Sequence, residues 1–257
     1  MKIQRQNEIL KLLAKEHTLK TEQLADLFHV SIETIRRDIR SMERSGLIKK
    51  VYGGISLCSG AMGAGTLDSW NSRLEQSHRE KAKIAAGALE LIEDNMVIAL
   101  DIGTTIYELS RLLGTKKNLS IITNSLLMAA ELSQNTAHSI YCIGGKVATN
   151  EGVTTGLYAR NFLSNFASID LFLMGADGLS LQYGVTEFSE GVVDVKHRLT
   201  AMARRNVVLA DHTKFGREAL FRSCDLSRIH TLITDEAAPA GELEALRKLG
   251  TEVIVIR

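Results

Sequence analysis

Two short helical patterns separated by a tight turn, at residues 21–44, constrain this chain more than any other feature. In the first pattern, Thr21 can cap a helix whose apolar residues recur on one helical face. Ser31 can cap the second helix, because its side chain can accept an N–H from the first turn. This arrangement is typical of a helix-turn-helix, in which the second helix enters the major groove of DNA.

The second helix has an apolar face and a basic face. Four apolar residues follow helical spacing and should pack inward, namely Ile32, Ile35, Ile39 and Met42. Arg36, Arg37 and Arg40 lie off that stripe and should face solvent. Because arginine can donate two hydrogen bonds to guanine or to phosphate oxygens, the basic face predicts contact with DNA.

A β-hairpin is predicted directly after this helix. Gly46 should end the helix, and residues 47–57 combine strand-forming residues with a Gly-Gly turn. Such a hairpin would make this a winged helix-turn-helix, with an amphipathic first helix at residues 3–13. The residues predicted to contact DNA are Ser31, Thr34, Arg36, Arg37, Arg40, Lys49, Lys50 and Tyr52.

The distribution of charge supports this interpretation over a merely solvated basic helix in an ordinary three-helix fold. The whole chain has a net charge of only +1. Residues 1–57, however, hold 11 Lys and Arg against 7 Asp and Glu, a net charge of +4. Residues 58–257 hold 20 against 23, a net charge of −3. The basic excess therefore lies with the helix-turn-helix, where a nucleic-acid partner would bind.

These residues resemble the N-terminal signature of the DeoR family of bacterial transcriptional regulators. Tyr52 stands where that signature usually has His, and Ile39 stands where it usually has Leu. The matching residues are Val30-Ser31, Thr34-Ile35-Arg36-Arg37-Asp38-Ile39, Glu43, Gly46, Ile48 and Tyr52-Gly53-Gly54.

Composition predicts an intracellular protein with an aliphatic core. Hydrophobic residues make up 45% of the chain and aromatic residues only 5%, so the core should be aliphatic. Cys58, Cys142 and Cys224 are far apart and lack metal-site spacing, so we expect reduced, structural cysteines in a cytoplasmic protein. Neither a signal peptide nor a membrane span is expected, and the sequence predicts no cofactor and no metal site.

The predicted domains are residues 1–57, a linker at 58–72 and a second domain at 73–257. The linker is expected because Cys58 to Gly65 is rich in Gly, Ser and Ala. From Trp70, a helical pattern is expected to continue to about Ile92. Beyond it, short apolar runs alternate with helical patterns, which predicts an α/β fold with a parallel sheet. The predicted strands are residues 96–100, 119–125, 139–143, 169–174, 206–210, 231–234 and 252–256.

Nearly every predicted strand ends in Asp, Asn, Gly or Thr, and ligands of open α/β sheets bind at that edge. Gly103-Thr104-Thr105 begins a helix and suits an anionic phosphate. Each residue alone has an ordinary structural explanation, as a turn glycine or a helix cap. Their coincidence predicts a pocket, in which Asp101, Asp177 and Asp211 could accept hydrogen bonds from sugar hydroxyls, and Lys196 and Lys214 could meet a phosphate or carboxylate.

The second domain resembles the DeoR-type sensor domain, which is similar to ribose-5-phosphate isomerase and glucosamine-6-phosphate deaminase. The resemblance implies recognition of a phosphorylated sugar without catalysis. Glu187 stands where Thr is usual and could select a different polyol or an amino sugar, or face solvent; His212 replaces the usual Ser and could be a surface loop residue. The predicted effector-binding residues are Asp101, Gly103, Thr104, Thr105, Asn124, Ser125, Gly144, Gly145, Gly175, Asp177, Gly178, Glu190, Lys196, Asp211 and Lys214.

Three functions are compatible with these features. The first is a DNA-binding regulator, a repressor of a sugar or sugar-alcohol catabolic operon that a phosphorylated sugar releases from operator DNA. It would act as a homo-oligomer, a dimer or tetramer, without membrane contact. The second is a sugar-phosphate isomerase or deaminase with a DNA-binding appendage, but no nucleophile–base pair stands out. The third, an architectural DNA protein, would need no ligand. The sequence favours the regulator.

Overall fold

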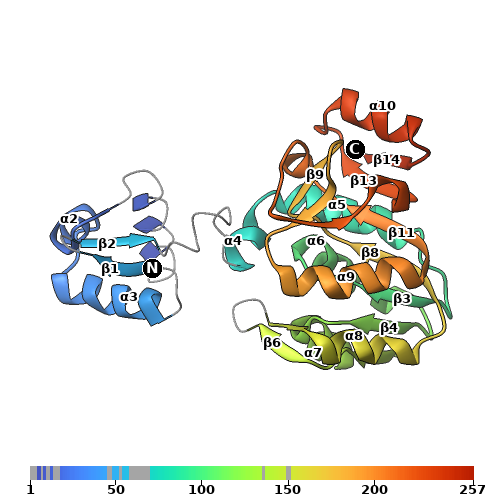
Figure 1. Ribbon diagram of the computed structural model, residues 1–257, viewed down its shortest axis with the longest axis horizontal. Helices are drawn as coiled ribbons and strands as arrows, with labels where there is room; N and C mark the ends of the chain where they lie inside the picture. Colours follow the sequence, from blue (N-terminus) through green and yellow to red (C-terminus); the bar gives the residue numbers. More distant parts are fainter. Residues whose placement is uncertain are drawn as a thin grey trace. The chain divides into compact units, whose positions relative to one another are not determined.

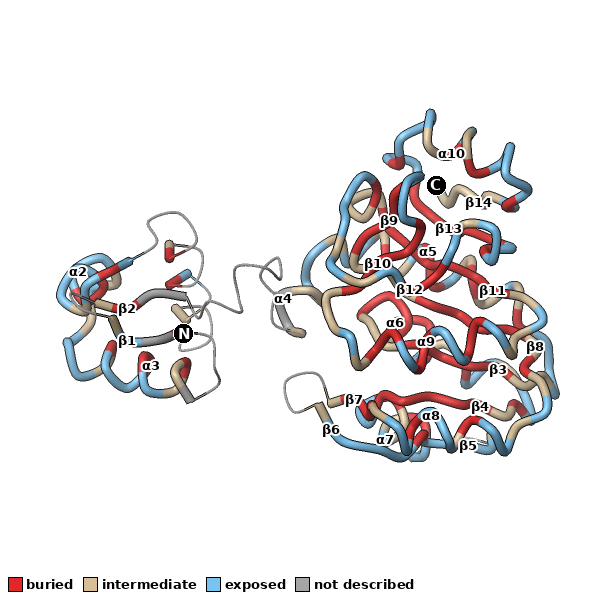
Figure 2. The backbone as a smooth tube through the Cα atoms, in the orientation of Figure 1, coloured by how far each residue is buried: buried red, intermediate tan, exposed pale blue. Residues whose placement is uncertain are grey.

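The computed structural model describes residues 5–6, 8–9, 12–13, 18–44, 48–51, 54–57, 70–134, 137–148 and 152–257. The chain divides into two compact units, Met1–Leu67 and Asp68–Arg257. Figure 1 shows the helices and strands of both units, and each unit has a hydrophobic core of its own (Figure 2). We call them the N-terminal unit and the sensor unit.

The N-terminal unit is a winged helix-turn-helix. Its two strands form an antiparallel hairpin in which Ile48 pairs with Leu57 and Val51 with Gly54. The described residues between Arg5 and Leu13 are helical, in agreement with the predicted first helix. The other elements are α2 (Thr21–Leu27), α3 (Ile32–Arg44), β1 (Ile48–Val51) and β2 (Gly54–Leu57).

Local hydrogen bonds explain where the two helices begin. The Ser31 hydroxyl accepts a hydrogen bond from the Thr34 N–H at 3.2 Å, which confirms Ser31 as the cap of α3. The prediction that Thr21 caps α2 was wrong, because Thr21 is the first helical residue and Lys20 precedes the helix. The Lys20 N–H donates instead to the Gln23 side chain, at 3.0 Å. Gly46 lies outside the described residues.

The inward face of α3 differs from the predicted stripe at its first residue. Ile35, Ile39 and Met42 are buried as expected, but Ile32 is 41% exposed. The reason is that Asp38, only 2% exposed, shares the inward face with those three residues, which leaves Ile32 at its edge. Both Arg5 nitrogens that contact the Asp38 carboxylate lie 2.7 Å from its Oδ2, so a buried ion pair ties α3 to the start of the chain.

The sensor unit is built on a seven-stranded sheet whose strands all run parallel, in the order β14-β13-β11-β8-β3-β4-β5. All seven predicted strands are present. Their bounds are β3 (Val97–Leu100), β4 (Ser120–Thr123), β5 (Ser139–Cys142), β8 (Ile169–Met174), β11 (Ala203–Leu209), β13 (Thr231–Asp235) and β14 (Glu252–Ile256).

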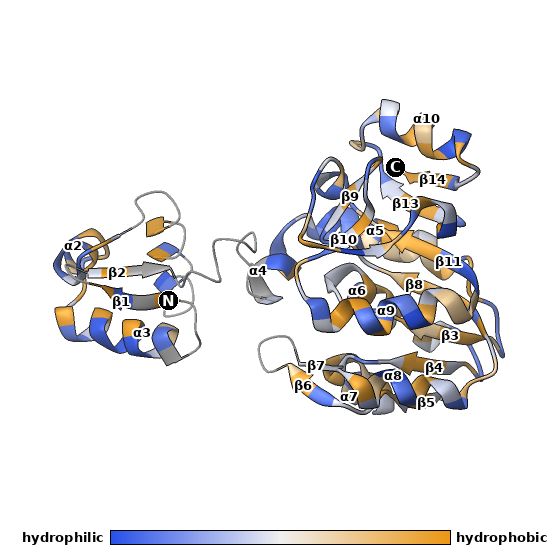
Figure 3. Ribbon diagram, viewed as in Figure 1, coloured by the Kyte–Doolittle hydropathy of each residue, from blue (hydrophilic) through white to orange (hydrophobic). Residues whose placement is uncertain are grey.

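Helices cover both faces of this sheet, so its central strands are apolar on both sides (Figure 3). Side chains of α5 (His78–Leu89), α6 (Thr104–Leu112) and α7 (Leu126–Ser133) pack in one buried cluster with residues such as Ile98 and Leu171. Side chains of α8 (Leu157–Phe162), α9 (Glu190–Met202) and α10 (Ala240–Lys248) pack in the other with Ala99 and Phe172. The sheet is therefore doubly wound.

The strand order places a crevice at the carboxyl ends of β3 and β8. These strands are neighbours, yet the chain leaves β3 toward β4 and leaves β8 toward β11, on the opposite side. Where connections diverge in this way, a crevice opens at the sheet edge. The residues that follow β3 and β8, Asp101 to Gly103 and Gly175 to Asp177, therefore border that crevice.

Several elements differ from the prediction. Residues 70–72 were predicted as linker and 70–92 as one helix, but α4 (Trp70–Glu75) begins at Trp70 and is separate from α5. Ser77, at φ 50°, breaks the helical path between them. The predicted linker residues 58–69 lie outside the described residues. Short antiparallel strands were also missed: β9 (Gly178–Ser180), β10 (Gly184–Glu187), β12 (Phe221–Cys224), and the hairpin of β6 (Lys146–Ala148) with β7 (Val153–Thr155).

We expect the Asp38–Arg5 ion pair to stabilise the N-terminal unit. Asp38→Ala should lower its free energy of unfolding by about 3 kcal/mol, because the mostly buried Arg5 guanidinium would lose its carboxylate. Amide hydrogen exchange across residues 18–44 measures this, with Asp26→Ala as a control because Asp26 is exposed. Equal, small losses in both variants would contradict a stabilising role for the pair.

Candidate functional site

The outward face of α3 forms a basic surface in the N-terminal unit. Arg36, Arg37 and Arg40 are all exposed, as predicted. A groove of about 570 Å³ runs between α3, the start of α2 and the wing. Its cationic lining residues are Lys20, Arg36, Arg40 and Lys50. Four cations on one groove create an attractive surface for a phosphate backbone.

The other predicted DNA-contacting residues have different local roles. Ser31 and Thr34 share a hydroxyl–hydroxyl hydrogen bond of 2.8 Å at the start of α3. The Lys50 ammonium on the wing lies 2.6 Å from the Glu43 carboxylate and remains exposed. The side chain of Lys49 and the whole of Tyr52 lie outside the described residues.

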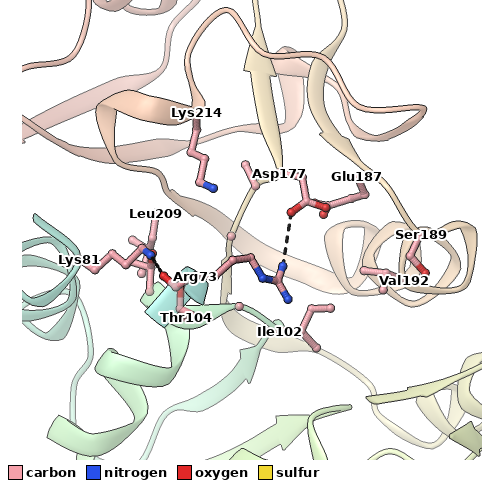
Figure 4. Close-up of a pocket in the computed structure, with 14 residues that line it drawn as sticks. Arg73, Lys81, Ile102, Thr104, Asp177, Glu187, Ser189, Val192, Leu209 and Lys214 are labelled. Atoms are coloured by element: carbon pink, nitrogen blue, oxygen red, sulfur yellow. Dashed lines mark hydrogen bonds and ion pairs between the residues drawn. The ribbon is translucent and has the colours of Figure 1, made fainter. Parts of the chain in front are cut away.

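The sensor unit has a pocket in the crevice between β3 and β8 (Figure 4). One wall is the start of α6, where Gly103 has φ 123° and no side chain caps the helix. The N–H groups of that first turn therefore have no side-chain acceptor. The lining residues are Arg73, Lys81, Ile102, Gly103, Thr104, Thr105, Gly175, Ala176, Asp177, Glu187, Ser189, Val192, Leu209 and Lys214.

Three cationic side chains reach this pocket from different elements (Figure 4). Arg73 comes from α4 and Lys81 from α5. Lys214 comes from a 3₁₀ turn, His212–Lys214, that follows β11. No carboxylate of the described residues forms an ion pair with Lys214.

The backbone at the end of α4, which carries Arg73, fixes the position of the Lys81 ammonium. The Lys81 ammonium donates to the carbonyl oxygens of Arg73 and Gln76, the latter at 2.7 Å, at the end of α4. Burial lowers the pKa of Lys81 to about 8, although Asp211 opposes the shift. The Arg73 guanidinium lies 3.7 Å from the Asp177 carboxylate, and its buried Nε has no hydrogen-bond partner. Arg73 therefore still has a donor to offer inside the pocket.

A buried cluster behind the pocket centres on Lys196. Its ammonium lies 2.7 Å from Asp101 Oδ2, donates to the Gly175 carbonyl at 3.0 Å and also binds Glu187. Burial alone would lower the pKa of Lys196, but the two carboxylates outweigh it and raise that pKa. Burial, with help from Asp177 and Asp101, outweighs the attraction of Lys196 and raises the pKa of Glu187 to about 8. The cluster thus holds one firm cation and a carboxyl group that carries a proton near neutral pH.

Comparison with known proteins agrees with this two-part architecture. Residues 5–61 match the DeoR-like helix-turn-helix domain, and residues 76–236 match the DeoR C terminal sensor domain. The chain belongs to the DeoR family. It therefore binds DNA through its helix-turn-helix and an effector through its sensor unit.

Several curated relatives of this DeoR-family protein are transcriptional regulators, and the similarity covers nearly the whole of each chain. HTH-type transcriptional regulator GolR of Listeria innocua is 34% identical, over 90% of each chain. The glycerol-3-phosphate regulon repressor of Escherichia coli K12 is 30% identical, over 95% of this chain and 94% of the relative. Repressor GlcR of Bacillus subtilis is 31% identical, over 96% and 93%. The chain is accordingly a transcriptional regulator and not an enzyme.

Among solved structures, D-ribose-5-phosphate isomerase in complex with phospho-erythronic acid is similar, with a TM-score of 0.42 and 20% identity over 54% of each chain. Ribose 5-phosphate isomerase A of Methanocaldococcus jannaschii gives a TM-score of 0.40 and 20% identity over 55% of each chain.

Many of the predicted effector-binding residues of this DeoR-family sensor come together. Gly103, Thr104, Thr105, Gly175, Asp177 and Lys214 line the pocket, and Asp101 and Lys196 lie in the cluster behind it. Asp211 is buried and close enough to Lys81 to affect its pKa. The residues that do not line the pocket are Asn124, Ser125, Gly144, Gly145, Gly178 and Glu190.

Several of the residues outside the pocket have packing roles instead. The Asn124 amide donates to the Thr154 carbonyl at 3.2 Å, and Ser125 caps α7 through the Met128 N–H. At Gly145, φ is 150° and a Cβ would lie 2.6 Å from the Thr155 carbonyl oxygen. Glu190 is exposed in the first turn of α9.

Arg73 and Lys81 are pocket residues that sequence reasoning missed. Both precede β3, whereas the pocket was predicted from polar residues at the ends of strands. The available signal was that both are basic residues within the helical pattern that opens the second domain. The alternative in which Glu187 faces solvent was wrong, because its residue is only 5% exposed.

His212 also differs from a simple loop residue. Its Nδ1 lies 2.9 Å from Asp235 Oδ1, and its side chain is 36% exposed. Cys142 and Cys224 are free, whereas Cys58 lies outside the described residues. Within the described ranges, no group of three or more potential ligands could hold a metal ion. No helix in those ranges is long and apolar enough to cross a membrane.

Glu187 predicts how the stability of the sensor unit depends on pH. Its pKa is about 8 when folded but about 4.3 in an unfolded chain. Between these values the folded protein binds the extra proton, so stability should fall as pH rises, by up to about 1.4 kcal/mol per pH unit. Glu187→Gln should remove this slope.

Urea denaturation at several pH values between 5 and 8 measures the effect. The fluorescence of Trp70, the one tryptophan of the chain, reports on the sensor unit, because its ring packs 5.7 Å from Tyr107. Glu190→Gln is the matched control, since Glu190 is exposed. Parallel slopes in wild type and Glu187→Gln would show that Glu187 does not take up the proton.

Proposed function

We propose that this DeoR-family protein is a cytoplasmic repressor of an operon for the catabolism of a sugar or sugar alcohol. A phosphorylated sugar binds the sensor pocket and lowers the affinity of the N-terminal unit for operator DNA. The observation that carries this proposal is the convergence of Arg73, Lys81, Lys214 and the start of α6 on one pocket.

The cationic side of the pocket supports a phosphate. The uncapped first turn of α6 presents N–H groups at the positive end of a helix dipole. Lys214 has no carboxylate partner among the described residues, and the Arg73 Nε lacks an acceptor. A phosphate would satisfy these donors together.

The opposite side supports the hydroxyl end of a sugar. Asp177 and Glu187 line the pocket and can exchange hydrogen bonds with hydroxyl groups. Glu187 near neutral pH is also able to donate, because its pKa is raised to about 8 by burial. An effector with a phosphate at one end and hydroxyl or amino groups at the other would match both walls.

The direction of the response is proposed from relatives that are named as repressors, those for glycerol-3-phosphate in E. coli and GlcR in B. subtilis. Release requires that the effector bind more tightly to the state with low operator affinity. By reciprocity, operator DNA must then weaken effector binding by the same factor.

Lys214→Ala tests the proposal most directly. The variant should need about 10- to 100-fold more effector to release operator DNA, because a charge-assisted hydrogen bond is worth about 1.5–3 kcal/mol. Operator affinity without effector should be unchanged, since Lys214 lies in the sensor unit. Lys248→Ala is the control, because its side chain is 75% exposed on α10.

The assay is fluorescence anisotropy of operator DNA with phosphorylated pentoses, hexoses, amino sugars and sugar alcohols, beside their unphosphorylated parents. Release by a parent compound as effective as its phosphate would refute a phosphate site. An unchanged dose in Lys214→Ala would remove Lys214 from it. Asp101→Ala is a poorer test, because it would strand the buried Lys196 charge and destabilise the fold.

We further propose that the protein is a homo-oligomer, a dimer or tetramer, because single helix-turn-helix units usually bind paired half-sites. Sedimentation velocity should give at least twice the mass of one chain, and footprinting should show two protected half-sites about 10 base pairs apart, centre to centre. A monomer bound to a single half-site would contradict this.

A further inference from the structure

A carboxylate lies within the basic face of α3. Glu33 is in the first turn, and Arg36, Arg37 and Arg40 follow it at three, four and seven residues, so all four share the outward face. The Glu33 side chain is 58% exposed, like those of Arg36 at 58% and Arg40 at 60%. The opposite face, with Ile35 and Ile39, is buried in the core.

The first turn of a recognition helix is the part that contacts base edges. The start of α3 is fixed by the Ser31 cap, so Glu33 belongs to that part. The Ser31 and Thr34 hydroxyls also lie at this turn, where they form a hydrogen bond with each other. A residue at position 33 is therefore placed to meet a base pair as α3 enters the major groove.

Repulsion from the DNA phosphates disfavours an acidic side chain at this position. DNA is surrounded by phosphates, and a carboxylate placed against it loses water and gains repulsion unless donors replace that water. Glu33 lies 3.9 Å from an Arg36 nitrogen and 3.7 Å from an Arg40 nitrogen. These distances give electrostatic support but exceed hydrogen-bonding distance, so the carboxylate oxygens can still accept.

We propose that Glu33 reads a cytosine of the operator. The carboxylate can only accept hydrogen bonds, and the major groove offers donors at cytosine N4 and adenine N6. Adenine also presents the N7 acceptor beside its donor, which repels a carboxylate, whereas cytosine presents the N4 donor alone. The neighbouring arginines offset the repulsion between Glu33 and the phosphates, and they can bind guanine or phosphate around it.

This proposal depends on DNA binding by α3 and is independent of the effector. Its test is selection of binding sites by the full-length protein from a random duplex library of about 30 base pairs, enough for two half-sites one helical turn apart. Wild type should enrich a motif with cytosine at one position of each half-site, preferred there by about 5- to 150-fold, which corresponds to 1–3 kcal/mol.

Two variants separate base reading from general electrostatics. Glu33→Gln should change that one position from cytosine to adenine, because glutamine pairs with adenine N6 and N7. Glu33→Ala should flatten the preference there and leave the other positions intact. Asp26→Asn removes one exposed acid from α2 instead and should leave the whole motif unchanged.

The selected motifs decide the outcome. If Glu33→Gln and Glu33→Ala both enrich the wild-type motif with the same cytosine preference, Glu33 reads no base and the proposal is overturned. It is also overturned if both variants shift several positions equally, since that would mean that Glu33 only orients the arginines. Circular dichroism melts of both variants establish that they fold as the wild type does.

Discussion

The pocket of the sensor unit depends on the contacts of one buried group, the Lys196 ammonium. It joins Asp101 after β3, the Gly175 carbonyl after β8 and Glu187 at the end of β10. Asp101 and Gly175 follow neighbouring strands of the parallel sheet, whereas Glu187 ends a strand of the separate β12-β10-β9 sheet, and the groups that meet between them are polar. A cation with three acceptors therefore takes the place of an apolar core there. The cost of burying the charge is offset only because every donor direction is filled, so the crevice walls keep their spacing.

The contacts of Lys196 also allow charged side chains to line the pocket. Because Lys196 already neutralises Asp101, the pocket presents Asp177 and Glu187 together with the cations Arg73, Lys81 and Lys214. Arg73 belongs to α4, the first described helix of the sensor unit. An anion bound there would compete with Asp177 for the guanidinium. Ligand contact thus reaches the element of the sensor unit that is nearest in sequence to the N-terminal unit.

Periodicity and turn chemistry were enough to predict the seven central strands and the helix-turn-helix, because buried runs and Ser31 act through local rules. The missed features depend on contacts between distant residues. Ile32 is exposed because Asp38 turns inward toward Arg5, 33 positions away. Arg73 joins a pocket formed by β3 and β8 although it precedes both strands. The short strands β9, β10 and β12 form a small sheet of their own, and their few residues carry little local signal.

An acidic side chain lies in each unit where simple charge complementarity would place a neutral or basic one. Glu33 interrupts the exposed arginine face of α3, and Glu187 adds an acid beside Asp177 in a pocket that three cations line. Each costs affinity for the generic partner, a phosphate backbone in one case and a phosphate group in the other. A partner that brings a matching hydrogen-bond donor compensates this cost, whereas a partner without one does not. Under both proposals the cations supply affinity for an anion, and Glu33 and Glu187 add selectivity for a partner with a donor.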